Sequence, residues 1–201
     1  MVDEFIFLDE LQFTKSDWRN RNKIKTNQNV KWLSIPVAHG KMSQLIKDTK
    51  ITDKRWAKKH WATIKQNYSK TQYFKTYKDC FEDLYLNNND FLLSQINYKF
   101  IIAINKILGI NTSMRWSEEF DLVDGKSDKL LGICKDCNAD IYLSGPAAKN
   151  YLDEGIFKTS NIKIEWMDYN NYPEHRQLFS PFEHSVTILD LIFNEGDNAT
   201  K

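Results

Sequence analysis

The sequence is poor in cysteine, proline and glycine, and it has no long hydrophobic run. Its three cysteines, Cys80, Cys134 and Cys137, are too few for a disulfide framework, so we expect reduced thiols. No apolar run approaches the roughly 18 residues that a transmembrane helix needs. The first residues, Met1-Val2-Asp3-Glu4, are acidic where a secretion signal would be positive. These absences predict a cytoplasmic protein that has no membrane span.

The sequence also lacks an excess of either charge. Its 28 Lys and Arg residues stand against 27 Asp and Glu residues, which leaves a net charge of +1. General nucleic-acid binders carry a basic excess because they neutralise backbone phosphates, so we expect no nucleic-acid partner. The 201 residues, of which 41% are hydrophobic, are enough for one globular domain. Such a domain buries roughly two thirds of its unfolded surface.

Hydrophobic periodicity divides the chain into three stretches of one predicted domain, residues 1–201. The first stretch, residues 4–39, holds two short apolar runs that read as strands, 5–8 and 32–37, on either side of a basic segment. The second repeats apolar side chains at helical spacing and predicts a helical insertion at about 41–109, with helices at 53–68, 70–86 and 89–108. The third alternates: helix 127–137, strand 140–143, a helix opening at Pro146, strand 162–167 and helix 185–194. This order predicts the α/β class, with a small, mainly parallel sheet.

The basic segment is the first candidate site. Within eleven residues it holds five cations and a single acid, Asp17; the cations are Lys15, Arg19, Arg21, Lys23 and Lys25. The whole chain has five Arg against 23 Lys, and two of the arginines lie here. Arginine favours bidentate contact with phosphate or carboxylate, which indicates an anion site. If the segment is extended, its odd positions share one side, and Asn20 and Asn22 face the other. The alternative is a solvated edge strand protected by lysines.

Two further segments sit where strands are expected to end. Asp9, Glu10 and Gln12 follow the first predicted strand, and ligands collect at the carboxyl ends of strands in open α/β sheets. The alternative for Asp9 is ordinary turn chemistry. Ser144-Gly145-Pro146 joins a strand to a predicted helix, whose free N–H groups can hold a phosphate or carboxylate. The segment is neither a Walker loop nor a nucleophile elbow, and an ordinary helix start explains it equally well.

The remaining reactive side chains show no metal-ligand spacing. The four histidines are His39, His60, His175 and His184, and no two of them have the i, i+4 spacing of a zinc helix. We expect His60, beside the apolar face of its helix, to be a packed histidine with its hydrogen bonds satisfied. His175 and His184 lie in an irregular segment that also holds the loop tyrosines Tyr169 and Tyr172. Cys134 and Cys137 lie near the end of a predicted helix, where the helix dipole raises the pKa of a thiol, so we interpret them as structural residues. The six tryptophans read as core residues.

Several strings of the sequence, in this order, resemble the WbqC-like family of bacterial proteins. They are Phe7-Leu8-Asp9 with Gln12-Phe13, Asp17-Trp18-Arg19-Asn20-Arg21-Asn22, Trp32-Leu33-Ser34-Ile35-Pro36-Val37, Tyr142-Leu143-Ser144-Gly145-Pro146-Ala147-Ala148, and the closing segment with Asp190, Leu191, Phe193 and Asn194. The resemblance spans nearly the whole chain. Family members usually carry a further strand and a Gly- and Pro-rich loop ahead of the strand seen here at Phe5. We therefore expect that this part of the family's ligand end is missing.

The resemblance implies a role in surface-polysaccharide chemistry, because family members occur in gene clusters for O-antigen and related polysaccharides. Glycine or related acyl transfer has been suggested for some of them. We therefore expect a transferase that adds an acyl or aminoacyl group to an amino sugar on a nucleotide carrier. In this scheme Asp9 or His175 is the general base, and Ser144 helps to stabilise the oxyanion.

The small-molecule substrate, a nucleotide sugar, would contact residues in three segments: Gln12, Lys15, Arg19, Asn20, Arg21, Lys25, Gly145, Tyr172 and Gln177. A non-catalytic sugar-nucleotide-binding or accessory protein of the same pathway explains the anion features as well. Nucleotidyl transfer is a third hypothesis, for which the sequence offers no metal ligands. The cofactor and the oligomeric state stay open.

Overall fold

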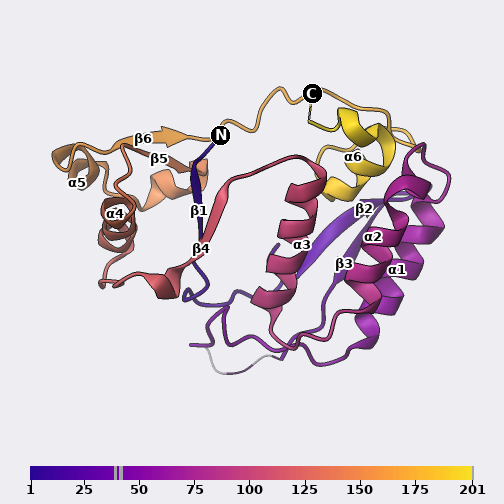
Figure 1. Cartoon of the computed structure of the whole chain (residues 1–201), viewed down its shortest axis with the longest axis horizontal. Helices are drawn as coiled ribbons and strands as arrows, with labels where there is room; N and C mark the ends of the chain where they lie inside the picture. The colour runs from indigo at the N-terminus through magenta and orange to yellow at the C-terminus, as the bar shows by residue number, and fades with distance from the viewer. Residues whose placement is uncertain (39, 41–42, 201) are drawn as a thin grey trace. The chain divides into compact units, whose positions relative to one another are not determined.

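The computed structural model describes residues 1–38, 40 and 43–200, so His39 lies outside the described residues. It combines helices with short strands (Figure 1). The contacts within the chain form two compact units. Unit 1 consists of Met1–Glu10 and Thr112–Tyr172, and unit 2 consists of Leu11–Asn111 and Pro173–Lys201. Of the three strand pairs that the structure describes, two are parallel, which confirms the predicted α/β class with small, mainly parallel sheets.

Unit 1 contains both parallel pairs. Its elements are β1 (Glu4–Phe7), β4 (Ser113–Trp116), η1 (Ser117–Glu119), α4 (Lys126–Asp136), β5 (Ile141–Ser144), η2 (Pro146–Asn150), α5 (Glu154–Thr159) and β6 (Lys163–Trp166). Strand β1 pairs with β4, and β5 pairs with β6. A parallel pair needs a crossover connection, and η2 and α5 supply it between β5 and β6. Phe157 of α5 is fully buried among residues that include Leu131 and Cys134 of α4.

Two details of unit 1 differ from the expectation. Strand β4 was not predicted, because its four residues include the charged Arg115 and its partner strand lies more than a hundred residues earlier in the chain. The helix expected to open at Pro146 is a short 3-10 helix, and the α-helix that follows it begins only at Glu154. Asp153 fixes that start, since its carboxylate accepts a hydrogen bond of 2.9 Å from the Gly155 N–H.

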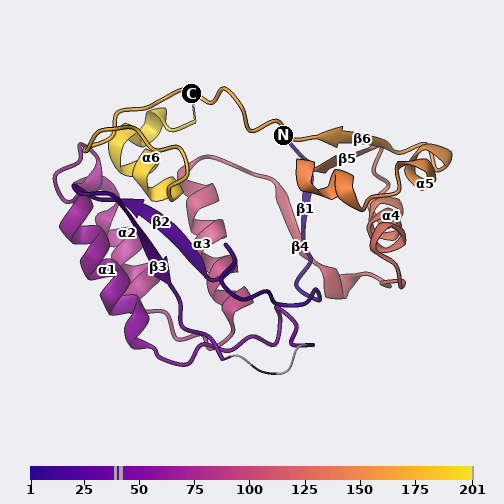
Figure 2. The same ribbon diagram turned by 180° about the vertical axis from the view of Figure 1, so that it is seen from behind.

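Unit 2 is an antiparallel hairpin packed against helices. Its elements are β2 (Arg21–Lys25), β3 (Val30–Ser34), α1 (Arg55–Tyr68), α2 (Phe74–Leu86), α3 (Leu93–Ile107), α6 (Ile188–Glu195) and η3 (Gly196–Asn198). Figures 1 and 2, which view the chain from opposite sides, show α1, α2 and α3 on one face of the hairpin. The predicted run of helices is confirmed with shorter ends. Among the described residues no helix is long and apolar enough to cross a membrane.

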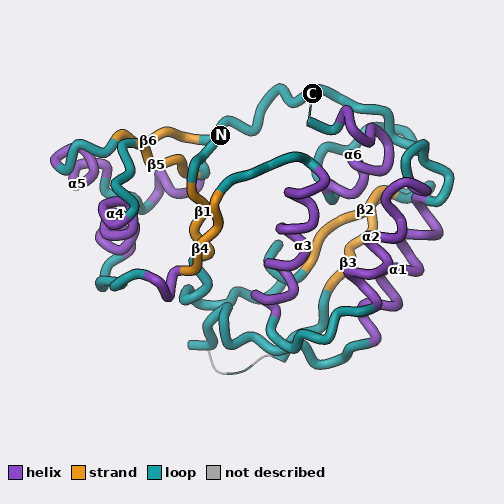
Figure 3. The backbone as a smooth tube through the Cα atoms, viewed as in Figure 1, coloured by secondary structure: helices purple, strands orange, loops and turns teal. Residues whose placement is uncertain are grey.

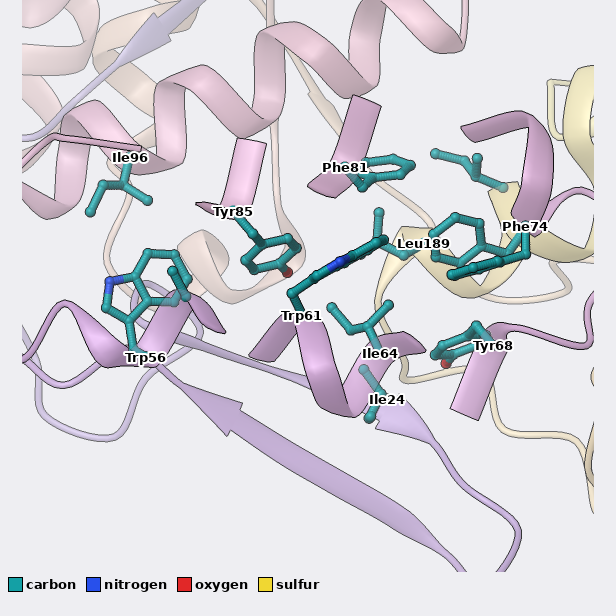
Figure 4. Packing of buried hydrophobic residues seen from close by; sticks show 13 residues of the cluster. Ile24, Trp56, Trp61, Ile64, Tyr68, Phe74, Phe81, Tyr85, Ile96 and Leu189 are labelled. Atoms are coloured by element: carbon teal, nitrogen blue, oxygen red, sulfur yellow. The ribbon is translucent and has the colours of Figure 1, made fainter. Parts of the chain in front are cut away.

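The core of unit 2 is aromatic. The Trp61 ring of α1 is stacked between Phe74 and Tyr85 of α2, with both centroid distances 6.0 Å (Figure 4). Ile24 brings strand β2 into the same cluster beside Tyr68. Burial of these rings removes large apolar areas from water, which is the main force that holds the helices on the hairpin.

Loops extend the hairpin of unit 2 beyond its strands (Figure 3). Before β2, the Asn20 carbonyl accepts a hydrogen bond of 2.7 Å from the Ile35 N–H, so pairing continues past Arg21 and Ser34. After the helices, the segment 173–187 returns to β2, where the Thr187 N–H donates to the Lys23 carbonyl at 2.8 Å. Backbone hydrogen bonds therefore extend the hairpin before β2 and hold the segment 173–187 against the middle of this strand.

Candidate functional site

The outward face of the β2–β3 hairpin holds two exposed tryptophans beside two cations. We call this group, Trp18, Arg21, Lys23 and Trp32, the cation–aromatic face. Lys23 and Trp32 are direct partners in the hairpin register. The Trp18 and Trp32 ring centroids are 5.0 Å apart. The side chains are 56% exposed for Trp18 and 38% exposed for Trp32, so the prediction that every tryptophan belongs to the core was wrong for these two.

Both cations of this face lie over aromatic rings. The Arg21 Cζ atom lies 4.1 Å from the Trp32 centroid, and the Lys23 Nζ atom lies 5.3 Å from the same ring and 5.7 Å from Trp18. Such contacts are worth about 0.5–1 kcal/mol each at exposed sites. Among the described residues, neither Arg21 nor Lys23 forms a salt bridge, although the Arg21 charge helps to lower the pKa of Asp17 nearby. The face therefore offers positive charge and flat rings together.

Arg19, the other predicted arginine, is already paired. Its Nη1 atom contacts the Asp17 carboxylate and lies 2.6 Å from the Thr14 hydroxyl. Burial raises the pKa of Asp17, but hydrogen bonds from Thr14 and the Trp18 N–H, together with the charge of Arg19, outweigh it and hold this pKa below its ordinary value. Asp17 is thus ionised at neutral pH and satisfies Arg19. Lys15 is exposed nearby.

A cavity of about 200 Å³ lies on the inward face of the same hairpin. Its walls are mostly apolar and come from the hairpin, from α1, α2 and α3, and from the start of α6; Trp56, Tyr85 and Ile96 among them are labelled in Figure 4. Trp18, Arg19 and Arg21 also line it, so the cavity and the cation–aromatic face share residues. Because drug-sized ligands need roughly 300–1,000 Å³, this cavity has room for part of a nucleotide sugar and not for all of it.

The polar groups along this cavity are mainly uncharged. The Asn97 amide donates to the Arg19 carbonyl at 2.9 Å, and the Asn20 amide donates to the Ile35 carbonyl at 3.0 Å. The His60 Nε2 atom lies 3.0 Å from the Ser34 carbonyl. Burial lowers the pKa of His60 to about 4, against the opposing effect of that hydrogen bond, so its imidazole is neutral at pH 7. The expectation that His60 is a packed, satisfied histidine is confirmed.

A buried acid–histidine pair forms the second group of unit 2. The His175 Nε2 atom lies 2.8 Å from the Asp190 Oδ1 atom, and Asp190 is only 1% exposed. Asn194, one turn further along α6, donates to the Asp190 carbonyl at 2.8 Å. Burial raises the pKa of the Tyr68 hydroxyl, and the nearby Asp190 charge raises it further. Asp190 was named in the family resemblance but not as a site residue; the signal for it is an acid inside the apolar run 188–193.

Two predicted anion-binding residues make contacts within the chain beside this pair. Lys25 is 5% exposed; its N–H donates to the Tyr68 hydroxyl at 2.9 Å, and its ammonium donates to the Pro181 carbonyl. The Gln177 side chain makes two hydrogen bonds of 2.9 Å with the Glu183 backbone. Both side chains thus hold the loop 173–187 in place, and Lys25 presents little charge to solvent.

The other predicted residues are divided between the units. Gln12 lies in unit 2, where it bridges to Leu45. Asp9, Ser144, Gly145 and Tyr172 lie in unit 1. The Asp9 Oδ1 atom is 3.5 Å from the Ser117 hydroxyl. Ser144 is buried at the end of β5, where its carbonyl accepts from the Met167 N–H at 2.8 Å, while Tyr172 is exposed.

The cysteine thiols are candidate metal ligands or nucleophiles. Cys80, Cys134 and Cys137 are free, and burial raises the pKa of both Cys134 and Cys137 to about 11, so these two are neutral thiols. Within residues 1–38, 40 and 43–200, no three His, Cys, Asp or Glu side chains gather in a way that could hold a metal ion. Unit 2 thus holds two described groups of polar side chains, the cation–aromatic face and the His175–Asp190 pair.

Comparison with known proteins places the chain in a family. The model of the WbqC-like protein family matches residues 1–201. The chain is 42% identical over 199 residues to "Uncharacterized protein Rv1507c" of Mycobacterium tuberculosis (strain ATCC 25618 / H37Rv), a match that covers 98% of this chain and 86% of that protein. The comparison with solved structures gave no significant match. The chain belongs to the WbqC-like protein family.

Proposed function

We propose that this chain is a transferase of bacterial surface-polysaccharide (O-antigen) biosynthesis that acts on an amino sugar carried by a nucleotide. In the proposed reaction it adds an acyl or aminoacyl group to the sugar amine. The observation that carries the proposal is the cation–aromatic face, because a nucleotide sugar combines flat rings with phosphates. Family membership supports the pathway.

The recognition step follows from the chemistry of that face. A base stacked on an aromatic side chain contributes about 1–3 kcal/mol, and Trp18 and Trp32 offer two such rings. Arg21 can hold a phosphate with two parallel hydrogen bonds, and Lys23 adds a point charge. Since the adjoining cavity is too small for a nucleotide, the base and phosphates would stay on the open face and the sugar substituent would point toward the cavity.

The chemical step needs a proton acceptor, and His175 supplies one. With Nε2–H donating to the Asp190 carboxylate, the Nδ1 atom of His175 is the acceptor. The sugar amine attacks the carbonyl carbon of an activated acyl donor, such as a thioester. A C–N bond forms, the C–S bond breaks, the amine proton passes to His175, and the thiolate leaves. The buried Asp190 stabilises the imidazolium that results, as a carboxylate does in a catalytic triad.

A second candidate function is a non-catalytic sugar-nucleotide-binding or accessory protein of the same pathway. One observation favours it: neither His175 nor Asp190 is among the described residues that line the cavity. In this alternative the His175–Asp190 pair only holds α6 against the loop 173–187, and the cation–aromatic face binds ligand without turnover.

The test separates binding from turnover. Isothermal titration with UDP-, dTDP- and GDP-linked amino sugars should show binding to one of them, weakened about tenfold or more by Arg21→Ala because a charge-assisted phosphate contact is lost. Arg55→Ala is the control, since it removes an arginine that is paired with Asp53 elsewhere in unit 2.

Turnover is then measured with that sugar nucleotide and acetyl-CoA or an activated glycine. His175→Gln should keep the binding and lower the rate about 10²–10⁴-fold, the usual loss when a general base is removed. Binding without product in the unchanged chain supports the accessory function. If no sugar nucleotide binds, both candidate functions are contradicted.

A further inference from the structure

We propose that the cavity on the inward face of the hairpin binds the transferred group as a short, uncharged acyl chain joined to an amide. The inference rests on the proposed function and decides between the two donor classes that it leaves open. It favours an acyl group of a few carbons over an aminoacyl group that keeps a free ammonium. Three properties of the cavity carry it: size, charge and one unsatisfied acceptor.

The size of the cavity limits the occupant. Its volume of about 200 Å³ is below the roughly 300–1,000 Å³ of sites that hold drug-sized ligands. That space holds an amide with a short chain, and it excludes a nucleotide. The walls come from side chains such as Ile35, Ile96 and Ile104, which gain most from contact with methyl and methylene groups.

The charge of the cavity limits the occupant further. No carboxylate is among the described residues that line it, and its histidine, His60, is neutral at pH 7. Its two charged lining residues, Arg19 and Arg21, are both cationic. An ammonium group placed there would lose its hydration, find no counter-ion among the lining residues and be repelled by Arg21, since Asp17 already pairs with Arg19. A glycyl group with a free amine is therefore disfavoured, whereas a neutral acyl chain has no charge to remove from water.

One buried acceptor indicates an amide. Asn20 lines the cavity, and its Oδ1 atom is buried and has no hydrogen-bond partner among the described residues. The orientation of this side chain is fixed, because its Nδ2 atom donates to the Ile35 carbonyl at 3.0 Å. Buried polar atoms almost always have a partner, so this oxygen calls for a donor from outside the chain. The N–H of an acylated amino sugar is such a donor.

The experiment compares two fragments of equal size that differ in charge, N-methylpropionamide and glycine N-methylamide. Ligand-observed NMR titrations on the full chain at about pH 6 keep the α-ammonium charged and His60 neutral. We expect the neutral fragment to bind at least about tenfold more tightly than the charged one. Equal affinity, or tighter binding of the charged fragment, would overturn the proposal.

Matched variants on α3 locate the binding. Ile104→Phe fills the cavity and should weaken N-methylpropionamide binding at least about fivefold, because the added ring takes the space of the fragment. Ile102→Phe, on the same helix but not among the cavity's lining residues, should leave it unchanged. If Ile104→Phe does not fold, Asn20→Ala tests the acceptor instead. Binding that neither Ile104→Phe nor Asn20→Ala weakens would contradict the assignment.

A parallel titration with UDP alone separates this proposal from the function on which it rests. UDP should bind through the cation–aromatic face whether or not the cavity is filled. If UDP binds and N-methylpropionamide does not, the acyl cavity is wrong and the nucleotide site stands. If the fragment binds and UDP, dTDP and GDP do not, the cavity stands and the sugar-nucleotide function falls.

Discussion

Lys23 and Ile24 are neighbours in β2, yet their surroundings have little in common. Lys23 lies beside two exposed tryptophans, whereas Ile24 is 1% exposed in the aromatic core. The difference arises because successive side chains of a strand point to opposite faces. In β3 the same alternation places Trp32 opposite Lys23 and Leu33 opposite Asn22. One short hairpin therefore presents charge and flat rings outward and an apolar cavity inward.

Under the proposed function, the two faces of this small sheet would contact two parts of one ligand. The outward face suits phosphates and rings, which remain partly solvated, and the inward face suits a group that gains from leaving water. Register places Lys23 and Trp32 on one face and Ile24 and Leu33 on the other, since a slip of one residue would exchange the faces. Trp18 and Arg21 belong to the outward group and also line the cavity. The contacts of Asn20 with Ile35 extend that register beyond the ends of the two strands.

The largest expected change in stability comes from placing a charged side chain on the inward face of the hairpin. Ile24→Lys places an unpaired ammonium in the core beside Ile64 and Tyr68, and we expect a loss of about 3–5 kcal/mol in the free energy of unfolding. Lys23→Ile, one residue away on the outward face, should change it by less than about 1 kcal/mol. Urea unfolding measures both. Similar losses for the two variants would show that the faces are not distinct.

Acid should lower the free energy of unfolding through His60, which lies on the inward side of the hairpin. The folded state keeps the His60 pKa near 4, whereas the unfolded chain has the ordinary value of 6.5. Below pH 6.5 the unfolded state therefore binds a proton that the folded state does not, and stability falls as the pH drops from 6.5 toward 4. At about 1.36 kcal/mol per pKa unit, the loss is about 3 kcal/mol.

The measurement is the unfolding free energy across that pH range, in the unchanged chain and in His60→Gln. The variant should start less stable at neutral pH, because the ring packing against Trp56 and Tyr85 is lost, but it should lose about 3 kcal/mol less on acidification. An equally steep pH dependence in both proteins would contradict the neutral, buried His60.

The α-helices of unit 2 could be predicted from the sequence, since amphipathic periodicity marks α1, α2 and α3 independently of their surroundings. Strand β2 was not among the predicted strands, since the sequence stated only which side chains share a face if the basic segment is extended. The candidate functional site was harder to predict from the sequence. Trp18 and Trp32 are exposed because the helices cover the other face of the hairpin. The residue pattern of a five-residue strand does not indicate which face will be covered. His175 pairs with Asp190 through an irregular loop that carries no pattern.

The smallest expected effect is on UDP binding, and it should differ between the neighbouring residues Trp18 and Arg19. Trp18→Ala removes a stacking ring from the cation–aromatic face and should weaken UDP binding about tenfold, within the 1–3 kcal/mol of a stacked base. Arg19→Ala removes a cation that Asp17 already neutralises, so we expect a change within about threefold. Isothermal titration of UDP compares the two, with the unfolding midpoint as a check that both variants fold. A larger loss for Arg19→Ala would mean that Arg19 leaves Asp17 to bind phosphate, and that charge on this side matters more than the rings.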